Sequence, residues 1–244
     1  MAFIRSISGI RATLGDGLIP DLIAKYVAGF ANYLPEGRIV VGRDGRPSGS
    51  WLEHLVAGAL AACGREVTII GMAPTPTVQL TVEKSDAVGG ISITASHNPE
   101  EWNGLKFLNA DGVFLNNEEN LEFWEYVDEN KLVYSLKTSE TEISYDLKAV
   151  DRHVLAVLNL IEDISVIREK NYFAVVDAVN ASGSVAVPEL LQALGCRIDD
   201  LHCDGSGIFP HTPEPIPENL SELAEKVKSS GADIGIAVDP DADR

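Results

Sequence analysis

The chain has 244 residues, of which 45% are hydrophobic, and a formal net charge of −18. This length allows one large domain or two of ordinary size. So acidic a surface repels nucleic acid and anionic membranes, and the absence of about 18 consecutive apolar residues argues against a membrane span. Three cysteines without metal-type spacing fit reduced thiols, so we expect a cytoplasmic protein with neither nucleic acid nor membrane as a partner.

Apolar periodicity and turn residues predict alternating strands and helices in the first part of the chain. After an initial strand and glycine-containing loop at 3–17, strands are expected at 38–42, 66–71, 86–95 and 105–108, and helices at 20–34, 50–63, 75–84 and 116–130. Ser50 and Glu53 have the spacing of a capping box for the second helix, and Asn116 or Asn117 is expected to cap the fourth. This alternation favours a mostly parallel sheet covered on both faces.

A polar stretch at residues 131–148 is the best candidate for a domain boundary. After it, a helix around 153–158 precedes strands at 172–177, 197–201 and 232–238, which alternate with helices at 185–194 and 220–229. We therefore expect an α/β fold of two three-layer α/β/α domains, residues 1–140 and 141–244, each with a mostly parallel mixed sheet. Because a parallel strand normally feeds another element, the last strand suggests that the sequence is part of a longer chain.

Three carboxylates, Asp239, Asp241 and Asp243, follow this last predicted strand at alternate positions. Carboxylates this close repel one another unless a cation lies between them. Oxygen ligands select hard cations, so Mg²⁺ is expected, with Ca²⁺ or Mn²⁺ as alternatives. An EF-hand is excluded because Arg244 stands where its loop needs glycine. A solvated acidic turn is the alternative to a metal site.

An apolar strand stops abruptly at Ser96, His97 and Asn98. Strand ends that face a crevice are where α/β proteins hold their chemistry. Ser96 is therefore a candidate nucleophile, and His97 and Lys106 are candidate bases beside it. A turn serine, a structural histidine and a surface lysine are the alternative readings. The absence of a G-x-S-x-G sequence around Ser96 disfavours an esterase.

Three arginines, Arg11, Arg43 and Arg46, lie in glycine-containing loops. Glycine lets backbone N–H groups approach an anion, and arginine binds phosphate with two parallel hydrogen bonds. Each arginine alone is more often an ordinary turn residue, but together, in so acidic a chain, they indicate a phosphate site. Phosphoryl transfer needs a carrier, a metal, a basic clamp and a proton shuttle, and the sequence offers a candidate for each.

These motifs together carry a family resemblance. The sequence from Thr94 to Pro99 resembles the phosphoserine loop of the α-D-phosphohexomutases, which include phosphoglucomutase, phosphomannomutase and phosphoglucosamine mutase. Residues 8–11, 42–48, 103–106 and 239–244 resemble four further motifs of that family in the same order. The resemblance covers the whole chain as the family's first two domains. Ala12, Pro240 and Ala242 stand where the family usually has glycine, and alanine tolerates a positive φ poorly.

The resemblance implies a reversible 1,6-phosphoryl shift on a hexose phosphate by way of a hexose 1,6-bisphosphate. Phosphorylated Ser96 would donate its phosphoryl group, and Lys106, assisted by His97, would act as general base or acid. The three aspartates and an oxygen of phosphorylated Ser96 would hold Mg²⁺.

The remaining expected site residues contact phosphate. The resemblance implies that Arg11 and Arg244 steady the transferring group, and Arg43 and Asn98 are further expected phosphate ligands. The family's third and fourth domains, which bind the sugar hydroxyls and the distal phosphate, are missing, so this chain alone is expected to lack turnover. Glucose, mannose and glucosamine phosphates are equally compatible substrates, and the sequence leaves the oligomeric state open.

Two other functions are weighed against this one. A phosphatase of the haloacid dehalogenase type could be built on Asp239 and Asp241, but such enzymes carry their nucleophilic aspartate after an early strand. A binding module without catalysis is the second alternative.

Overall fold

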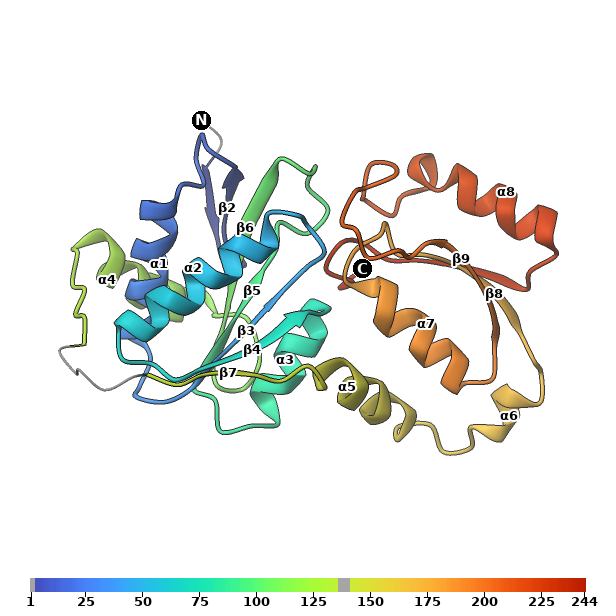
Figure 1. Ribbon diagram of the computed structural model, residues 1–244, viewed down its shortest axis with the longest axis horizontal. Coiled ribbons are helices and arrows are strands. Elements are labelled where there is room, and N and C mark those ends of the chain that lie inside the picture. Colours follow the sequence, from blue (N-terminus) through green and yellow to red (C-terminus); the bar gives the residue numbers. More distant parts are fainter. Residues whose placement is uncertain (1–2, 136–140) are drawn as a thin grey trace.

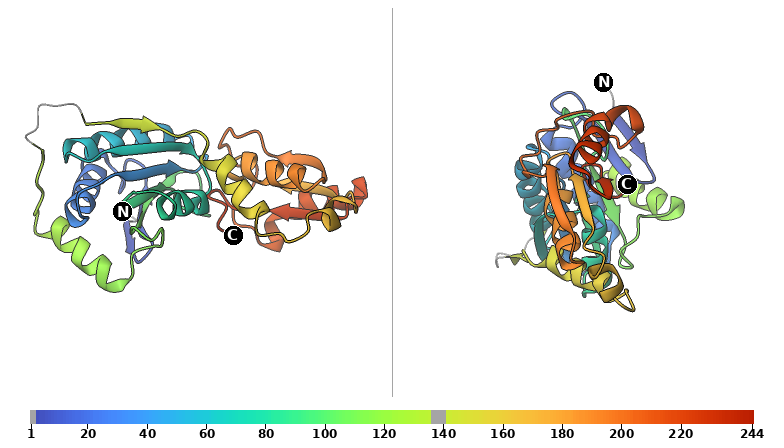
Figure 2. Two further views of the ribbon diagram at one scale, coloured as in Figure 1. Left: turned by 90° about the horizontal axis from the view of Figure 1, so that it is seen from below. Right: turned by 90° about the vertical axis from the view of Figure 1, so that its right-hand side faces the viewer.

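The structure is a computed structural model that describes residues 3–135 and 141–244. Two α/β units lie one after the other along the longest dimension of the molecule (Figure 1). The first contains a seven-stranded sheet in the order β1-β2-β6-β5-β3-β4-β7, and the second a three-stranded sheet in the order β10-β8-β9. The predicted class, two α/β domains with helices on both faces of each sheet, is confirmed (Figure 2).

The sheet of the first domain is mixed. Its strands are β1 (Phe3–Ser6), β2 (Gly9–Thr13), β3 (Ile39–Arg43), β4 (Val67–Met72), β5 (Gly89–Ile93), β6 (Trp102–Leu108) and β7 (Ile143–Tyr145). The pairs β3–β4, β3–β5 and β4–β7 are parallel, whereas β1–β2, β2–β6 and β5–β6 are antiparallel. Helices α1 (Pro20–Tyr33), α2 (Gly49–Ala62) and α4 (Asn117–Asp128) cover one face, and α3 (Thr75–Glu83) with α5 (Ala149–Leu158) covers the other.

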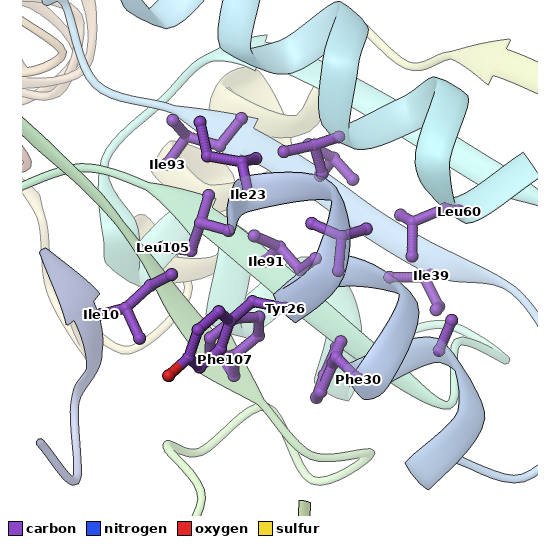
Figure 3. Close-up of a cluster of buried hydrophobic side chains, with 14 of the residues drawn as sticks. Ile10, Ile23, Tyr26, Phe30, Ile39, Leu60, Ile91, Ile93, Leu105 and Phe107 are labelled. Atoms are coloured by element: carbon purple, nitrogen blue, oxygen red, sulfur yellow. The ribbon is translucent and has the colours of Figure 1, made fainter. Parts of the chain in front are cut away.

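The main core lies between the sheet and helices α1, α2 and α4. Ile23 and Phe30 of α1 are fully buried there, and they lie beside Ile91 of β5 and Phe107 of β6 (Figure 3). Burying side chains of this size contributes about 1.5–3 kcal/mol each. Strand β5 is buried along its whole length, which fixes the position of the loop that follows it.

Some predicted element ends were right and others were wrong. Asn116 caps α4 with the full capping box, because its side chain accepts the Glu119 N–H while Glu119 accepts the Asn116 N–H. The box predicted at Ser50 is wrong, since α2 begins one residue earlier and Glu53 turns toward Arg43 instead. The expected strand and loop at residues 3–17 form two antiparallel strands, β1 and β2.

The second domain is smaller and its sheet is wholly parallel. Its strands are β8 (Phe173–Asp177), β9 (Arg197–His202) and β10 (Ile234–Ala237), and its helices are α6 (Ser165–Arg168), α7 (Gly183–Ala193), α8 (Ser221–Ser230) and the 3₁₀ helix η1 (Pro217–Asn219). Helix α7, with α5 beside it, covers one face of this sheet, and α8 covers the other (Figure 1).

The junction between the domains lies after β7. The predicted boundary between residues 140 and 141 adjoins residues 136–140, which lie outside the described residues. Strand β7 follows this boundary yet still pairs with β4, so the first sheet extends to Tyr145. Helix α5 then packs against both α3 and α7, which joins the two domains. In the described part of the chain, no helix has the length and apolar character needed to cross a membrane.

Candidate active site

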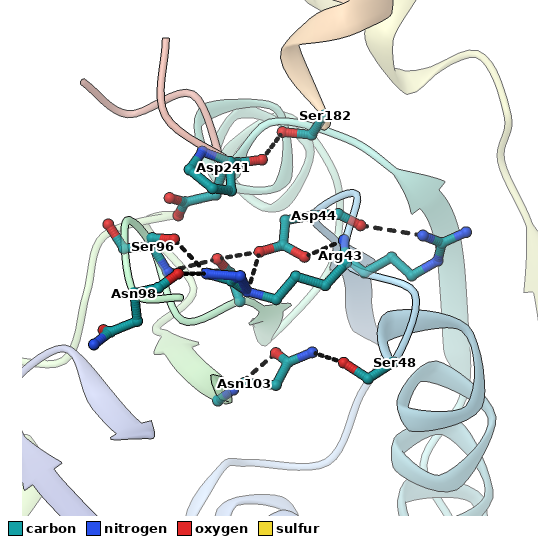
Figure 4. A network of polar contacts seen from close by, with 12 residues as sticks. Arg43, Asp44, Ser48, Ser96, Asn98, Asn103, Ser182 and Asp241 are labelled. Atoms are coloured by element: carbon teal, nitrogen blue, oxygen red, sulfur yellow. Dashed lines mark hydrogen bonds and ion pairs between the residues drawn. The ribbon is translucent and has the colours of Figure 1, made fainter. Parts of the chain in front are cut away.

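The candidate site lies where loops after β5 and β10 meet between the two domains (Figure 4). A cavity of about 270 Å³ opens there. It is lined by Ser6, Ser8, Gly9, Ile10, Arg11, Thr94, Ala95, Ser96, His97, Lys106, Phe114, Asp243 and Arg244. Six of the predicted site residues, from four separate segments of the sequence, therefore share one cavity.

A buried hydrogen-bond network holds the loop that carries Ser96. Arg46 Nη2 donates to the carbonyl oxygens of Ser96 and Asn98 at 2.6 and 2.8 Å. Thr94 Oγ1 accepts the Ser96 N–H at 2.8 Å and donates to Asp44 Oδ2 at 2.7 Å. Ser96 has a φ of 52°, a left-handed conformation that costs about 1–3 kcal/mol in a non-glycine residue. The network fixes this strained residue so that its side chain faces the cavity.

The three arginines predicted to bind phosphate have different positions. Arg11 lines the cavity and its Nη1 donates to Asn98 Oδ1 at 3.0 Å. Arg46 is fully buried beside Asp44, with 3.2 Å between Arg46 Nε and Asp44 Oδ2. The prediction that Arg46 binds phosphate is therefore wrong, and this side chain supports the Ser96 loop instead. Arg43 donates to the Asp44 carbonyl and lies 3.7 Å from Glu53, outside the residues that line the cavity.

The Ser96 hydroxyl lies between a carboxylate and an imidazole. Its Oγ donates to Asp239 Oδ2 at 3.0 Å and lies 3.3 Å from His97 Nδ1. Burial, followed by the charge of Arg244, lowers the pKa of His97, so this imidazole is neutral near pH 7. Glu214 Oε1 lies 3.9 Å from His97 Nε2 and 3.4 Å from Arg244 Nη1, which places the second domain's loop at the cavity.

The acidic loop after β10 is anchored to both domains. Thr75, the first residue of α3, donates its backbone N–H to the Asp241 carbonyl at 2.8 Å and its hydroxyl to Asp241 Oδ2 at 2.6 Å. Ser182 Oγ donates to the Pro240 carbonyl at 2.8 Å (Figure 4). The three carboxylates therefore contact the first domain although they belong to the second: Asp239 meets Ser96, and Asp241 and Asp243 meet Lys106.

The electrostatics of this loop fit a divalent cation. One oxygen from each of Asp239, Asp241 and Asp243 lies within 4.8 Å of the others. Burial first, and then repulsion from Asp241 and Asp243, raises the pKa of Asp239 to about 7. Asp241 Oδ1 is buried and has no hydrogen-bond partner among the described residues. Such an orphaned carboxylate oxygen, beside two more carboxylates, is suited to a hard cation.

Lys106 supplies the positive charge that balances this cluster. Its Nζ donates to Asp241 Oδ2 and to Asp243 Oδ2, both at 2.7 Å. Burial alone would lower the pKa of Lys106, but the two carboxylates outweigh it and raise that pKa. Lys106 is thus protonated in this arrangement and cannot accept a proton until those ion pairs are broken.

The supporting residues Asp44, Thr75, Thr94 and Glu214 were missed by sequence reasoning. Asp44 lies between Arg43 and Arg46, but nothing in the sequence of this loop indicates that the aspartate is buried. Thr75 meets Asp241 across 166 residues of sequence, so no local pattern could reveal the contact.

Replacing Ala242 with glycine is expected to stabilise the chain by about 0.5–1 kcal/mol. Ala242 has a φ of 50°, which glycine adopts without strain, and this relief exceeds the entropy that glycine gains on unfolding. Urea unfolding measures the difference. Ala237→Gly, in strand β10, is the matched control and should destabilise. If Ala242→Gly destabilises as much as the control, the loop is not strained in solution.

A strained serine near three carboxylates and several cationic side chains, between two α/β domains, is an arrangement suited to phosphoryl transfer. The sequence matches the phosphoglucomutase/phosphomannomutase family, α/β/α domain I over residues 4–133 and α/β/α domain II over residues 151–244. The chain belongs to this family, as the motif resemblance predicted. Nothing in the site favours the haloacid dehalogenase-type alternative.

Relatives from several organisms support the assignment. A Pyrococcus furiosus protein named a probable phosphoglucosamine mutase is 36% identical over 237 residues, which are 97% of this chain and 51% of the relative. A Thermococcus kodakarensis phosphoglucomutase/phosphomannomutase is 36% identical over 242 residues, 97% of this chain and 53% of its own. A Burkholderia thailandensis family member has a TM-score of 0.80 at 27% identity, covering 98% and 54% of the two chains. The chain spans about half the length of the curated relatives it matches.

Proposed function

We propose that the chain forms the phosphoserine-bearing part of a Mg²⁺-dependent phosphohexomutase. The enzyme interconverts hexose 1-phosphate and hexose 6-phosphate through a hexose 1,6-bisphosphate. The observation that carries the proposal is the Ser96 hydroxyl, held on a strained loop 3.0 Å from Asp239 and open to a cavity with cationic walls. The names of the relatives, which are mutases of glucosamine, glucose and mannose phosphates, support the substrate class.

Ser96 serves as the phosphoryl carrier. A substrate hydroxyl oxygen bonds to the phosphorus as the bond to Ser96 Oγ breaks, and the hydroxyl proton passes to a base. Return of the other phosphate to Ser96 completes the cycle. Arg11 and Arg244, which line the cavity, stabilise the charge on the transferring group. Asn98 contacts Arg11 and orients it, whereas Arg43 would have to leave Glu53 before it could bind phosphate.

Asp239, Asp241 and Asp243, with an oxygen of phosphorylated Ser96, are the proposed Mg²⁺ ligands. When bound, the ion would supply positive charge against the transferring phosphoryl group. His97 is neutral and 3.3 Å from Ser96 Oγ, so it can accept a proton as the site stands. Lys106 becomes a proton acceptor only after its two carboxylates are engaged by another cation, because they raise its pKa.

The proposal is tested with a protein of the relatives' length that contains these residues. It should convert the 1-phosphate of glucose, mannose or glucosamine into the 6-phosphate when Mg²⁺ and a trace of hexose 1,6-bisphosphate are present. The relative rates identify the preferred hexose. Failure with all three sugars, in a protein that is folded and binds Mg²⁺, would refute the proposal.

Replacing Lys106 with methionine is expected to destabilise the metal-free chain by about 3 kcal/mol, because the fully buried carboxylate of Asp241 loses its cation, as does the more exposed carboxylate of Asp243. Mg²⁺ should then raise the Tm more in this variant than in the unmodified chain, since no ammonium competes for the carboxylates. Lys84→Met is the control, because its pair with Glu83 is exposed and is worth less than about 1 kcal/mol. Equal Mg²⁺ responses in all three proteins would show that Lys106 does not compete with the cation.

A further inference from the structure

A second cluster of ligand-type side chains lies in the second domain and takes no part in the proposed reaction. Asp177 ends β8 and His202 ends β9, and the two are paired across the parallel strands just after a shift in register. His211 reaches them from the loop between β9 and η1. One donor atom from each side chain lies within 4.8 Å of the others. We propose that these three residues bind a transition-metal ion, with Zn²⁺ as the preferred ion. This proposal does not depend on the proposed function.

The hydrogen bonds of His211 call for a positive charge at this point. Its Nδ1 lies 2.8 Å from the Thr212 carbonyl oxygen, which can only accept, so Nδ1 carries a proton. Its Nε2 lies 2.8 Å from Asp177 Oδ2. In a neutral ring protonated at Nδ1, Nε2 is an acceptor, as Asp177 Oδ2 is, so a lone pair on each of these two atoms faces the other. A metal ion bound by both atoms, or a second proton on the ring, removes this conflict.

The surrounding contacts favour the metal. Asp177 Oδ1 accepts the Val179 N–H at 3.0 Å, which fixes the carboxylate. His202 Nε2 lies 3.3 Å from Glu222 Oε2, so this carboxylate can orient the second imidazole. Metal-bound histidines generally donate their other N–H to a carbonyl or carboxylate. Thr212 is such a partner for His211, and Glu222 is one for His202 with Nδ1 as its proposed ligand atom. The three ligand side chains are between 2% and 18% exposed, so the donor atoms are shielded but reachable.

The donor types decide which ion is favoured. Two imidazoles and one carboxylate suit Zn²⁺, whereas Mg²⁺ prefers oxygen ligands alone. Three protein ligands leave a fourth position for water, as in open zinc sites. An ion here would tie the His211 loop to the ends of β8 and β9. The same loop carries Glu214, which contacts Arg244 at the cavity, so the ion would help to position that residue.

The test is Zn²⁺ titration of the tag-free, demetallated chain against a chromophoric competitor, in excess Mg²⁺. Titrations are made on the unmodified chain and on Asp239→Asn/Asp241→Asn, in which the carboxylate cluster is disabled. Both should bind one Zn²⁺ per chain. His211→Gln and His202→Ala should each weaken binding by a hundredfold or so, and Glu222→Gln by about tenfold. Co²⁺ in place of Zn²⁺ should give a visible absorption band that the histidine variants lose.

His54→Gln, at an exposed position in α2, is the matched control and should leave Zn²⁺ affinity unchanged. Circular dichroism checks that each variant is folded, and exposed Glu222 gives a test that does not disturb the buried ligands. Absence of Zn²⁺ uptake by the unmodified chain would overturn the proposal and leave an imidazolium–carboxylate pair. Loss of all uptake in Asp239→Asn/Asp241→Asn, or unchanged affinity in both histidine variants, would also overturn it.

Discussion

Replacing Ser96 with alanine is expected to lower kcat of the complete enzyme by at least about a thousandfold, because the carrier oxygen is lost. The fold should be preserved. The contacts from Arg46 and Thr94 use the backbone carbonyl and N–H of this residue, and alanine keeps both; only the hydroxyl contacts with Asp239 and His97 are lost. Two measurements are needed: the rate of hexose phosphate conversion, and the intact mass after incubation with a hexose 1,6-bisphosphate. The variant should show neither turnover nor added phosphate.

Ser85→Ala is the matched control, since Ser85 is exposed and lies outside the site cavity. It should keep both the activity and the phosphate of the unmodified enzyme. A Ser96→Ala enzyme that still gains one phosphate would place the carrier elsewhere. A variant that gains no phosphate but keeps its turnover would mean that no phosphoserine is required.

The parts of the site that were predictable are contiguous in sequence. The Ser96 loop and the three aspartates each follow a strand, and alternating strands and helices bring strand ends to one edge of a sheet. A cap at Asn116 or Asn117 was predicted for α4 for the same reason, because a cap contacts only the first helical turn; Asn116 is the cap, and Glu119 completes the box. In each case the decisive neighbours lie within one short segment.

Arg43 and Arg46 show where such reasoning fails. Both lie in one glycine-containing loop and look equally suited to phosphate. Arg46 is buried because its partners, the carbonyls of Ser96 and Asn98, lie 50 and 52 residues further along the chain. The partner of Arg43 is Glu53, which sequence spacing had assigned to a helix cap. Only the packing of the loop against β5 and α2 separates these two roles.

The acidic loop after β10 also has a part that was predictable and a part that was not. Repulsion among three nearby carboxylates predicted a cation from the sequence alone. The sequence did not predict that Lys106 neutralises these carboxylates, because its contact with Asp241 spans 135 residues. The high pKa of Asp239 depends mainly on its burial between the two domains, and residue spacing in the sequence does not predict that burial.

The affinity of the chain for Mg²⁺ is expected to fall by up to tenfold for each pH unit below about 7. Burial and the neighbouring carboxylates raise the pKa of Asp239 to about 7, so below that value the ion must displace a proton. Above it, the affinity should level off. Isothermal titration calorimetry at several pH values gives the affinity, and repeating it in buffers of different ionisation enthalpy counts the protons released.

The metal-free chain should show the opposite trend in stability. The pKa of Asp239 in the folded chain lies above its ordinary value of 3.8, so the folded state holds its proton more tightly. This contribution to the free energy of unfolding is complete below that ordinary value and is lost as pH rises through about 7. Asp239→Asn should remove both pH trends, whereas Asp233→Asn, outside the acidic loop, should keep them. If Mg²⁺ affinity does not change with pH, Asp239 is already ionised in the metal-free chain and Lys106 alone balances the cluster.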